Sequence, residues 1–397
     1  MKIWCIFFYI VAQILNFGLP ACYPKCHCPK EDEAVCYLDS SETVIPDALP
    51  DYLRSLIIRG GTFENFNRHY LATFPRLETL SLISTFIRRL APYSFNHLDN
   101  LKNLYLKYNL IETLGPNAFG DLKRLRSLEL PDNGIEVIEG WAFNGSGQIQ
   151  ELELRFNPIK IIKSNAFSNM KDISYLKFPH NVTEIEPKAF DGLIDVHFLD
   201  MHNWPAAKSR VGGIRSGTFY GLSHVTSFLI SNSDLGIVYP HAFDHAYNIG
   251  TMAITMCRIL LLDKRSFLNV RNLKYLEFER NEIQKMNKFF ASQFFDNKTD
   301  LYRTEVKFSK NRFSCDCTNM KVLYTLSKKF GEQLLDENFC IMSGEVTLNV
   351  VLDDLKQNCT NHFEIEDIDN EATISLRNQC LILMISTLIS LYLVFIL

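Results

Sequence analysis

The residues best suited to covalent or metal chemistry are eight cysteines in two sets towards the ends of this 397-residue chain. The sets have the spacings C-x3-C-x-C-x7-C and C-x-C-x22-C-x18-C, formed by Cys22, Cys26, Cys28 and Cys36 and by Cys315, Cys317, Cys340 and Cys359. Even sets of this kind are typical of disulfides in an oxidising compartment. Zinc is the competing interpretation of four thiols, but no paired C-x2-C knuckles are present. We therefore expect two disulfide-bonded caps.

Other side chains give no pattern for catalysis or for metal binding. The ten histidines are scattered, and His241 and His245, although four apart, flank Phe243 in a predicted turn. No nucleophile lies beside a recognisable base, and no pair of carboxylates suggests a pocket. We expect no enzymatic activity, no cofactor and no metal. The net charge of −4 and the lack of a basic stripe also argue against a nucleic-acid partner.

The element that must position these residues is a repeat of 24 residues, L-x-x-L-x-L-x-x-N-x-I-x-x-I-x-x-x-A-F-x-x-L. Its copies start at Leu77, Leu101, Leu125, Ile149, Ile173, Val196, Val225, Ile249 and Leu273. A period of this length predicts a stacked solenoid in which each copy adds one short strand to a parallel sheet. The fold class is therefore α/β-type, mostly β and irregular, with a curved concave sheet of about ten strands.

Two further positions of the repeat are predicted to be structural. An amide or thiol follows each strand and should satisfy buried backbone groups where the chain turns inward; these residues are Asn109, Asn133, Asn157, Asn181, Cys257, Asn281 and Asn311. Cys257 is thus expected to be a buried ladder residue and not a nucleophile. The recurring phenylalanines, such as Phe119 and Phe143, should form a column under the convex side. The lengthened copy predicts a protruding basic loop over residues 204–214.

The repeats and both cysteine sets together resemble extracellular leucine-rich repeat proteins over roughly Cys22 to Cys359. The resemblance is carried by the repeats, by Cys22-Tyr23-Pro24-Lys25-Cys26-His27-Cys28-Pro29 and by Asn311-Arg312-Phe313-Ser314-Cys315-Asp316-Cys317. It implies a horseshoe with a cap at each end. It also implies the disulfides Cys22–Cys28, Cys26–Cys36, Cys315–Cys340 and Cys317–Cys359, a pairing that the sequence alone does not fix.

The two ends of the chain predict secretion and attachment to a membrane. Residues 1–21 have the pattern of a signal peptide, with Lys2 before an apolar run. Residues 380–397 carry no charge and indicate a glycolipid (GPI) anchor signal, with attachment at Asn370; a plain membrane span is the alternative. The predicted domains are the signal at 1–21, the caps at 22–52 and 311–360, the repeats at 53–310 (about 10–11 copies), an acidic stalk at 361–379 and the tail at 380–397.

The candidate ligand-binding residues lie between the leucines of the predicted strands. They combine aromatic and charged side chains, a composition typical of interface hot spots: Tyr105, Lys107, Tyr108, Arg155, Phe156, Tyr175, Phe198 and His202. Any exposed sheet carries some aromatics, and Leu229 and Ala253 could equally mark a homodimer surface. Of the four sequons, Asn144 and Asn297 are the expected glycan carriers, Asn181 should stay bare as a ladder residue, and Asn358 precedes a half-cystine.

These observations favour a binding protein. The leading hypothesis is a cell-surface recognition or adhesion protein that binds a protein ligand or co-receptor through the concave face, without a cytoplasmic signalling domain of its own. The alternative is a secreted structural or organising component of the extracellular matrix.

Overall fold

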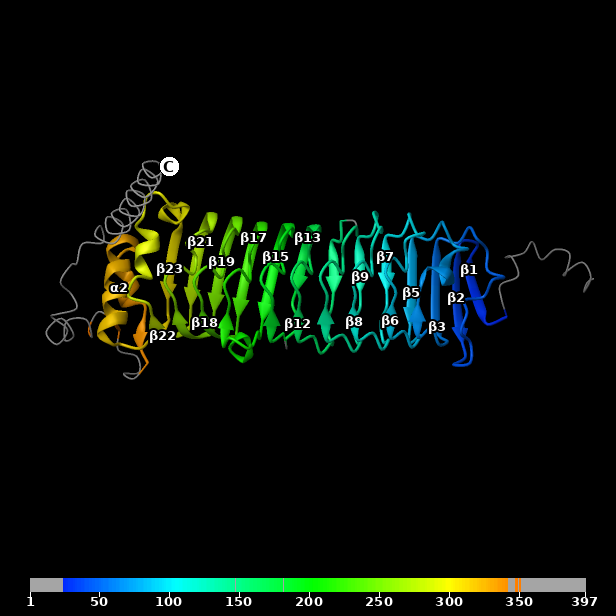
Figure 1. Ribbon diagram of the computed structural model, residues 1–397, viewed down its shortest axis with the longest axis horizontal. Helices are drawn as coiled ribbons and strands as arrows, with labels where there is room; N and C mark the ends of the chain where they lie inside the picture. Colours follow the sequence, from blue (N-terminus) through cyan, green and yellow to red (C-terminus); the bar gives the residue numbers. More distant parts are fainter. Residues whose placement is uncertain (1–23, 147, 181, 342–346, 349, 351–397) are drawn as a thin grey trace, which may run out of the picture.

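The computed structural model describes residues 24–146, 148–180, 182–341, 347–348 and 350, and these form a solenoid of stacked turns (Figure 1). The prediction of a mostly β solenoid with a parallel sheet is confirmed. Each turn contributes one strand to a 13-stranded inner sheet, whose first two strands form an antiparallel pair at the amino-terminal end. In sheet order its strands are β1 (Cys26–Lys30), β2 (Glu33–Leu38), β3 (Ser55–Gly60), β5 (Thr79–Ile83), β7 (Asn103–Tyr105), β9 (Ser127–Glu129), β11 (Glu151–Glu153), β13 (Lys171–Lys177), β15 (Ile194–His202), β17 (Ser223–Ser231), β19 (Tyr247–Thr255), β21 (Arg271–Glu279) and β23 (Glu305–Ser309).

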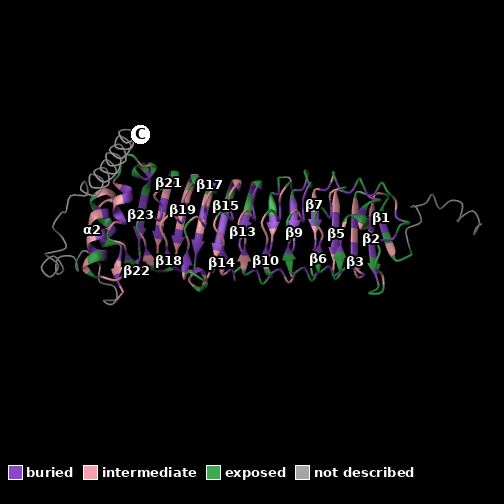
Figure 2. Cartoon of the chain, in the orientation of Figure 1, coloured by how far each residue is buried: buried purple, intermediate pink, exposed green. Residues whose placement is uncertain are grey.

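The register of the inner sheet follows the repeat of the sequence. Leu80, Leu104 and Leu128 are partners on successive parallel strands, each 24 residues from the next. All three are completely buried, because alternate residues of a strand point to opposite faces of the sheet and the leucines all point to the face that packs against the core. Figure 2 shows buried and exposed residues alternating along the strands. The side chains between the leucines are thereby left on the concave face.

A second set of short strands lies on the opposite side of the solenoid, where the sequence predicts only turns. It forms three separate outer sheets. These are β4 (Asn65–Phe66) with β6 (Arg89–Leu90); β8 (Thr113–Leu114), β10 (Val137–Ile138), β12 (Ile161–Ile162) and β14 (Glu184–Ile185); and β16 (Gly213–Ile214), β18 (Asp234–Val238), β20 (Arg258–Leu262), β22 (Glu282–Met286), β24 (Arg312–Phe313) and β25 (Phe339–Cys340). Neighbouring strands are the same distance apart on the inner and on the outer side of the solenoid. The two sides therefore have similar lengths, and this limits the curvature of the array.

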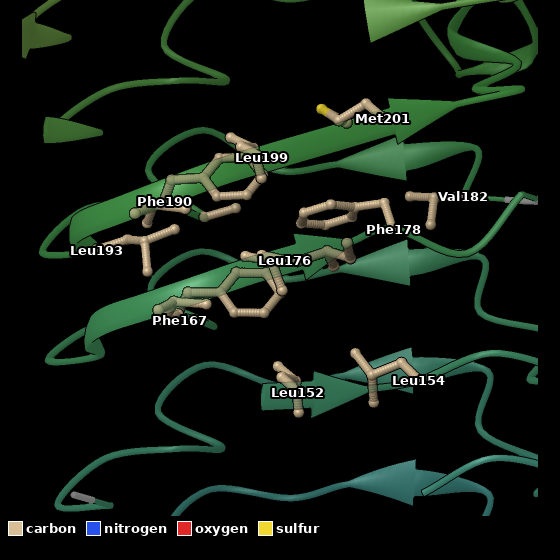
Figure 3. Close-up of a cluster of buried hydrophobic side chains, with 14 of the residues drawn as sticks. Leu152, Leu154, Phe167, Leu176, Phe178, Val182, Phe190, Leu193, Leu199 and Met201 are labelled. Carbon is tan, nitrogen blue, oxygen red and sulfur yellow. The ribbon is translucent and has the colours of Figure 1, made fainter. Parts of the chain in front are cut away.

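The core between the two sets of strands contains the predicted phenylalanine column. From Phe66 to Phe267 successive rings stack with centroids 4.7 to 6.2 Å apart. Figure 3 shows Phe167 and Phe190 on successive turns, with Leu176 and Leu199 beside them. Offset stacking of this kind adds to the burial of apolar area that holds neighbouring turns together.

The predicted amide ladder is also present among the described residues. Asn109 Oδ1 accepts from the Thr85 amide at 2.9 Å, and its Nδ2 donates to Leu82 O at 2.8 Å in the preceding turn. Asn281 Oδ1 accepts from the amide of Cys257 at 2.8 Å in the same way. Thr85, Ser233 and Asn338 extend the ladder beyond the positions that the sequence indicates. Asn181 lies outside the described residues.

Cys257 occupies its ladder position as a buried thiol. It is 2% exposed and its Sγ contacts Thr255 O at 3.2 Å. Burial raises the pKa of the Cys257 thiol to about 12, so the thiolate is absent at neutral pH. The prediction of a structural thiol is confirmed.

The lengthened copy is more compact than a protruding loop. Trp204 stands at the ladder position, 4% exposed, with its ring edge against Phe219 at 6.0 Å. Ala206 is also buried and begins the short 3-10 turn η2 (Ala206–Lys208). Only the tip, including Lys208 and Arg210, reaches solvent.

Both ends of the array are closed, and each has a disulfide. Cys26–Cys36 joins β1 to β2, and Cys315–Cys340 ties the far end; both pairs are those that the resemblance implies. Cys28 and Cys317 are also disulfide-bonded. The partners implied for them, Cys22 and Cys359, lie outside the described residues.

The carboxy-terminal end of the array is covered by α2 (Cys317–Phe330), a helix that the sequence analysis did not predict. Asp316 caps its first turn by accepting from the Asn319 amide at 2.9 Å, and Leu323 and Leu326 are buried against the last turns. The remaining short elements are α3 (Gln333–Asp336), η1 (Arg68–Leu71), η3 (Ala291–Phe294) and η4 (Asp300–Arg303). The cap keeps the apolar end of the last repeat from water.

Candidate ligand-binding face

The concave face presents its side chains in rows, because each residue between two leucines has a partner on the next strand. One row contains Asn103 and Ser127 and, further along, Tyr175 and Phe198. The next contains Tyr105 and Glu129, then Lys177 and Asp200. Each row therefore contains the residues at one position of the repeat, and the type of side chain in a row changes from turn to turn.

Tyr105, Lys107 and Tyr108 form one corner of this face. Lys107 Nζ lies 5.5 Å from the centre of the Tyr105 ring and 2.5 Å from the Glu129 carboxylate on the next turn. Tyr108 is 58% exposed and adopts φ of 55° just before the ladder residue. The left-handed backbone there turns the ring outward at the edge of the sheet.

Arg155 and Phe156 occupy the repeat positions of Lys107 and Tyr108, two turns further along the solenoid. The Arg155 Nε donates to Glu153 at 2.6 Å, and the guanidinium carbon lies 6.0 Å from the Phe156 ring centre. Phe156 is 72% exposed. A largely exposed phenylalanine beside an arginine that is already held by a carboxylate is a preorganised apolar contact.

Tyr175 and Phe198 are brought into direct contact by the register of β13 and β15. Their rings stack at 5.2 Å with 6° between the planes, and the Tyr175 hydroxyl donates to Asp200 Oδ2 at 3.0 Å. Burial, and next the hydrogen bond to Asp200, raise the pKa of Tyr175, so this hydroxyl is a donor at neutral pH. Tyr175 still exposes 43% of its surface.

His202 lies at the end of β15, four residues beyond Phe198 on the same strand, which corresponds to about 13 Å along the strand. Its Nδ1 is 3.0 Å from Ser231 Oγ, and its ring meets that of His180 edge-on at 5.9 Å. The hydrogen bond fixes the orientation of the imidazole, and the structure of the described residues does not join it to the Tyr175–Phe198 pair.

The eight candidate residues do not form one continuous aromatic patch. Glu129, Glu151 and Glu153 lie between the Tyr105 corner and the Tyr175–Phe198 pair, and Leu229 and Ala253 continue the sheet as a bland surface. The arrangement is two aromatic areas, one around Tyr105 and the other at Tyr175 and Phe198, on either side of an acidic strip. Lys107 and Arg155 pair with Glu129 and Glu153 in this strip, so among its described carboxylates Glu151 is the one open to a basic group of a partner.

Two exposed apolar residues that the sequence analysis missed adjoin the first corner. Phe86 and Leu110 follow the ladder position in neighbouring turns and are 48% and 37% exposed. They extend the apolar edge that begins at Tyr108. The signal in the sequence was that these two copies have a large apolar residue directly after the ladder position. The next two copies have Gly134 and Pro158 there instead.

A family model described as "BspA type Leucine rich repeat region" matches residues 64–197 and 205–321 in six copies, more than half of the chain. The chain belongs to this leucine-rich repeat family. Leucine-rich repeat proteins stack their repeats into extended surfaces used for binding. Disulfides at both ends of the array are typical of an extracellular member.

Two solved structures are similar to this leucine-rich repeat protein in fold. A chain of an octameric complex of Latrophilin 3, Unc5D and FLRT2 is 19% identical, with a TM-score of 0.49 over 80% of this chain and 92% of that chain. A chain of the mouse RP105/MD-1 complex is 20% identical, with a TM-score of 0.46 over 81% of this chain and 53% of that one. The present chain therefore spans about half the length of the second.

The remaining predicted sites are placed only in part. Asn297 is exposed, whereas Asn144 is half-buried and its side chain is hydrogen-bonded to Asn117 and Asn169. Asn370 and residues 380–397 lie outside the described residues. Within the described part of the repeat protein, no helix is long and apolar enough to cross a membrane, and no three His, Cys, Asp or Glu side chains are grouped to hold a metal ion.

Proposed function

We propose that this leucine-rich repeat protein is a recognition or adhesion protein of the cell surface that binds a protein ligand or co-receptor through its concave face. The observation that carries the proposal is the Tyr175–Phe198 pair on the inner sheet, in which Asp200 holds the Tyr175 ring, Phe198 is half-buried against it, and Tyr175 remains exposed to solvent. Aromatic side chains held rigid in this way lose little entropy when a partner covers them.

The acidic strip and the first aromatic area, around Tyr105, support the same proposal. Glu129 and Glu153 each hold a cation in place, Lys107 and Arg155 respectively, so the side chains around Tyr105 and Phe156 are ordered before any partner arrives. Truncation of a residue at the centre of such an interface typically costs about 2–4 kcal/mol of binding free energy.

The test is a screen of cell-surface proteins with the full chain as probe, followed by measurement of the affinity of each hit for two triple variants. The first variant, Tyr105→Ala, Phe156→Ala and Tyr175→Ala, should weaken binding at least a hundredfold while the unfolding transition stays in place. The matched control replaces aromatics of similar exposure outside the inner sheet with alanine: Tyr93, Trp141 and Tyr302, which are 39%, 44% and 47% exposed. Equal loss in both variants, or none in the first, contradicts the proposal.

Attachment to the membrane is part of the proposed function. We infer a GPI anchor at Asn370 from the uncharged tail and its spacer. Treatment of intact cells with a phospholipase specific for inositol anchors should release the protein. Retention after treatment favours a membrane span, and protein found only in the matrix favours the alternative role as a matrix component.

A further inference from the structure

A hollow of about 310 Å³ lies at the edge of the inner sheet where the chain enters β7 and β9. It is lined by Lys102, Lys123, Arg124, Leu125, Arg126 and Gln148. Four of these six side chains are cationic and none is acidic. We call the four cations the basic edge. They come from two neighbouring turns, so the hollow exists only once the turns are stacked.

Most of the charge of the basic edge is not neutralised by the protein. Lys102 contacts Glu78 at 2.5 Å, and Arg124 donates to the neutral Asn100 Oδ1 at 2.8 Å. In the part of the chain that the structure describes, neither Lys123 nor Arg126 makes an ion pair. Asp99 and Asp121 belong to the same turns, but neither lines the hollow.

Elsewhere on the solenoid, several cations have a carboxylate one turn away. Arg88 and Glu112 are 3.5 Å apart, Lys160 and Glu136 are 2.9 Å apart, and Lys163 contacts Glu186 at 2.9 Å. At the basic edge the equivalent neighbours of Arg126 are Lys102 on one side and Gln150 on the other. The basic edge is distinguished by four cations that line one hollow with no acidic side chain among them, which marks a site for an anion.

The spacing of these cations suits a linear anion. Lys102 and Arg126 occupy the same position on adjacent strands, about 4.8 Å apart along the array. One turn before Lys123 and Arg124, the equivalent positions hold Asp99 and Asn100, and two turns away the exposed Arg76 and Lys171 stand there. The four cations of the basic edge are therefore spread along the long axis over two turns instead of converging on one point.

We propose that the basic edge binds a linear sulfated polysaccharide. Arginine binds planar oxyanion groups with two parallel hydrogen bonds, and three of the four cations have no acidic competitor within ion-pair distance. Disulfides at both ends of the array place the protein in an oxidising compartment, where sulfated polysaccharides are presented. This site is separate from the aromatic areas of the concave face and does not depend on the proposed function.

The experiment measures binding of the full chain to a size-defined heparin oligosaccharide over a range of salt concentrations. The variant Lys123→Gln, Arg124→Gln and Arg126→Gln should weaken binding at least tenfold and reduce the slope of log K against log salt by roughly 2, because three charges are lost. The charge-matched control removes Arg271, Lys274 and Arg303, exposed cations at the far end of the solenoid, and should bind as the unaltered protein does.

Three results would overturn the proposal. These are no binding of the oligosaccharide, equal binding of the desulfated oligosaccharide, and equal loss in the control variant. Preferential binding of single-stranded RNA over the oligosaccharide would also overturn it by assigning the edge to nucleic acid. All three replaced side chains are exposed, so amide hydrogen exchange should show an unchanged fold.

Discussion

Replacement of Asn109 by alanine tests whether the amide ladder holds neighbouring turns together. Asn109 is 4% exposed and serves two turns at once. Its Oδ1 accepts from the amides of Thr85 and Ile87 at 2.9 and 3.3 Å, and its Nδ2 donates to Leu82 O at 2.8 Å. Alanine removes all of these partners at once.

The magnitude follows from the groups that lose a partner. The Thr85 amide and the Leu82 carbonyl lose short hydrogen bonds in a buried place, and each unsatisfied group costs about 1–3 kcal/mol. The longer contact to Ile87 contributes less. We therefore expect the Asn109→Ala variant to lose about 2–6 kcal/mol in the free energy of unfolding.

Amide hydrogen exchange is the sharper assay, because a solenoid can open locally without unfolding throughout. The amides of Thr85 and Ile87 should lose protection, and denaturant unfolding should shift to lower concentration. The control is Asn103→Ala on the concave face, where the side chain donates only to Thr79 Oγ1 at 3.1 Å; it should change stability by less than about 1 kcal/mol. Retained protection at Thr85 in the Asn109→Ala variant would refute the reasoning.

Three further predictions can be checked with standard measurements. Burial and the hydrogen bond to Asp200 raise the pKa of Tyr175. The stability that this hydroxyl contributes should therefore be complete below the pKa of an unfolded tyrosine and lost as the pH rises through the pKa of Tyr175 in the folded protein. The Tyr175→Phe variant should lack this pH dependence in a series of unfolding curves measured at different pH. Cys257, with its pKa raised to about 12, should react with iodoacetamide only after denaturation, and rapid labelling of the folded protein would contradict this. Peptide mapping should find a glycan on Asn297 and none on Asn181, since Asn297 is exposed and Asn181 has the ladder position of its repeat.

The parts of the fold that the sequence predicted are those in which one residue type repeats in one environment. Asn109 and Phe119 recur at fixed spacing because the same buried contacts recur in every turn. The outer strands were missed because a pair such as Val137–Ile138 offers a single buried residue, too little for a pattern of period 2. Helix α2 did carry a signal, an Asp316 cap before apolar residues at helical spacing, but the sequence analysis described this segment only as a disulfide cap and assigned it no secondary structure.

The candidate site was predictable in composition but not in arrangement. The copy starts at Ile173 and Val196 already place Tyr175 and Phe198 at the same repeat position, and the paired residues of β13 and β15 agree with this register. Whether two such rings stack, and whether Lys102 and Arg126 line one hollow, depends on the side-chain conformations and on the stacking of the turns. The repeat pattern gives the register but not these side-chain positions.

The basic edge and the first aromatic area are close because they share one strand. Lys102 and Tyr105 are three residues apart at β7, which corresponds to about 10 Å along an extended chain. A protein that covers Tyr105 therefore passes beside any polyanion held at the edge, and its own charge decides whether the two ligands help or oppose each other. Glu151, which makes no ion pair in the described part of the chain, favours a partner with a basic group at the acidic strip. Such a partner would be attracted by the sheet and by the polyanion alike, so a surface rich in sulfated chains would strengthen recognition at the concave face without any new contact from the protein itself.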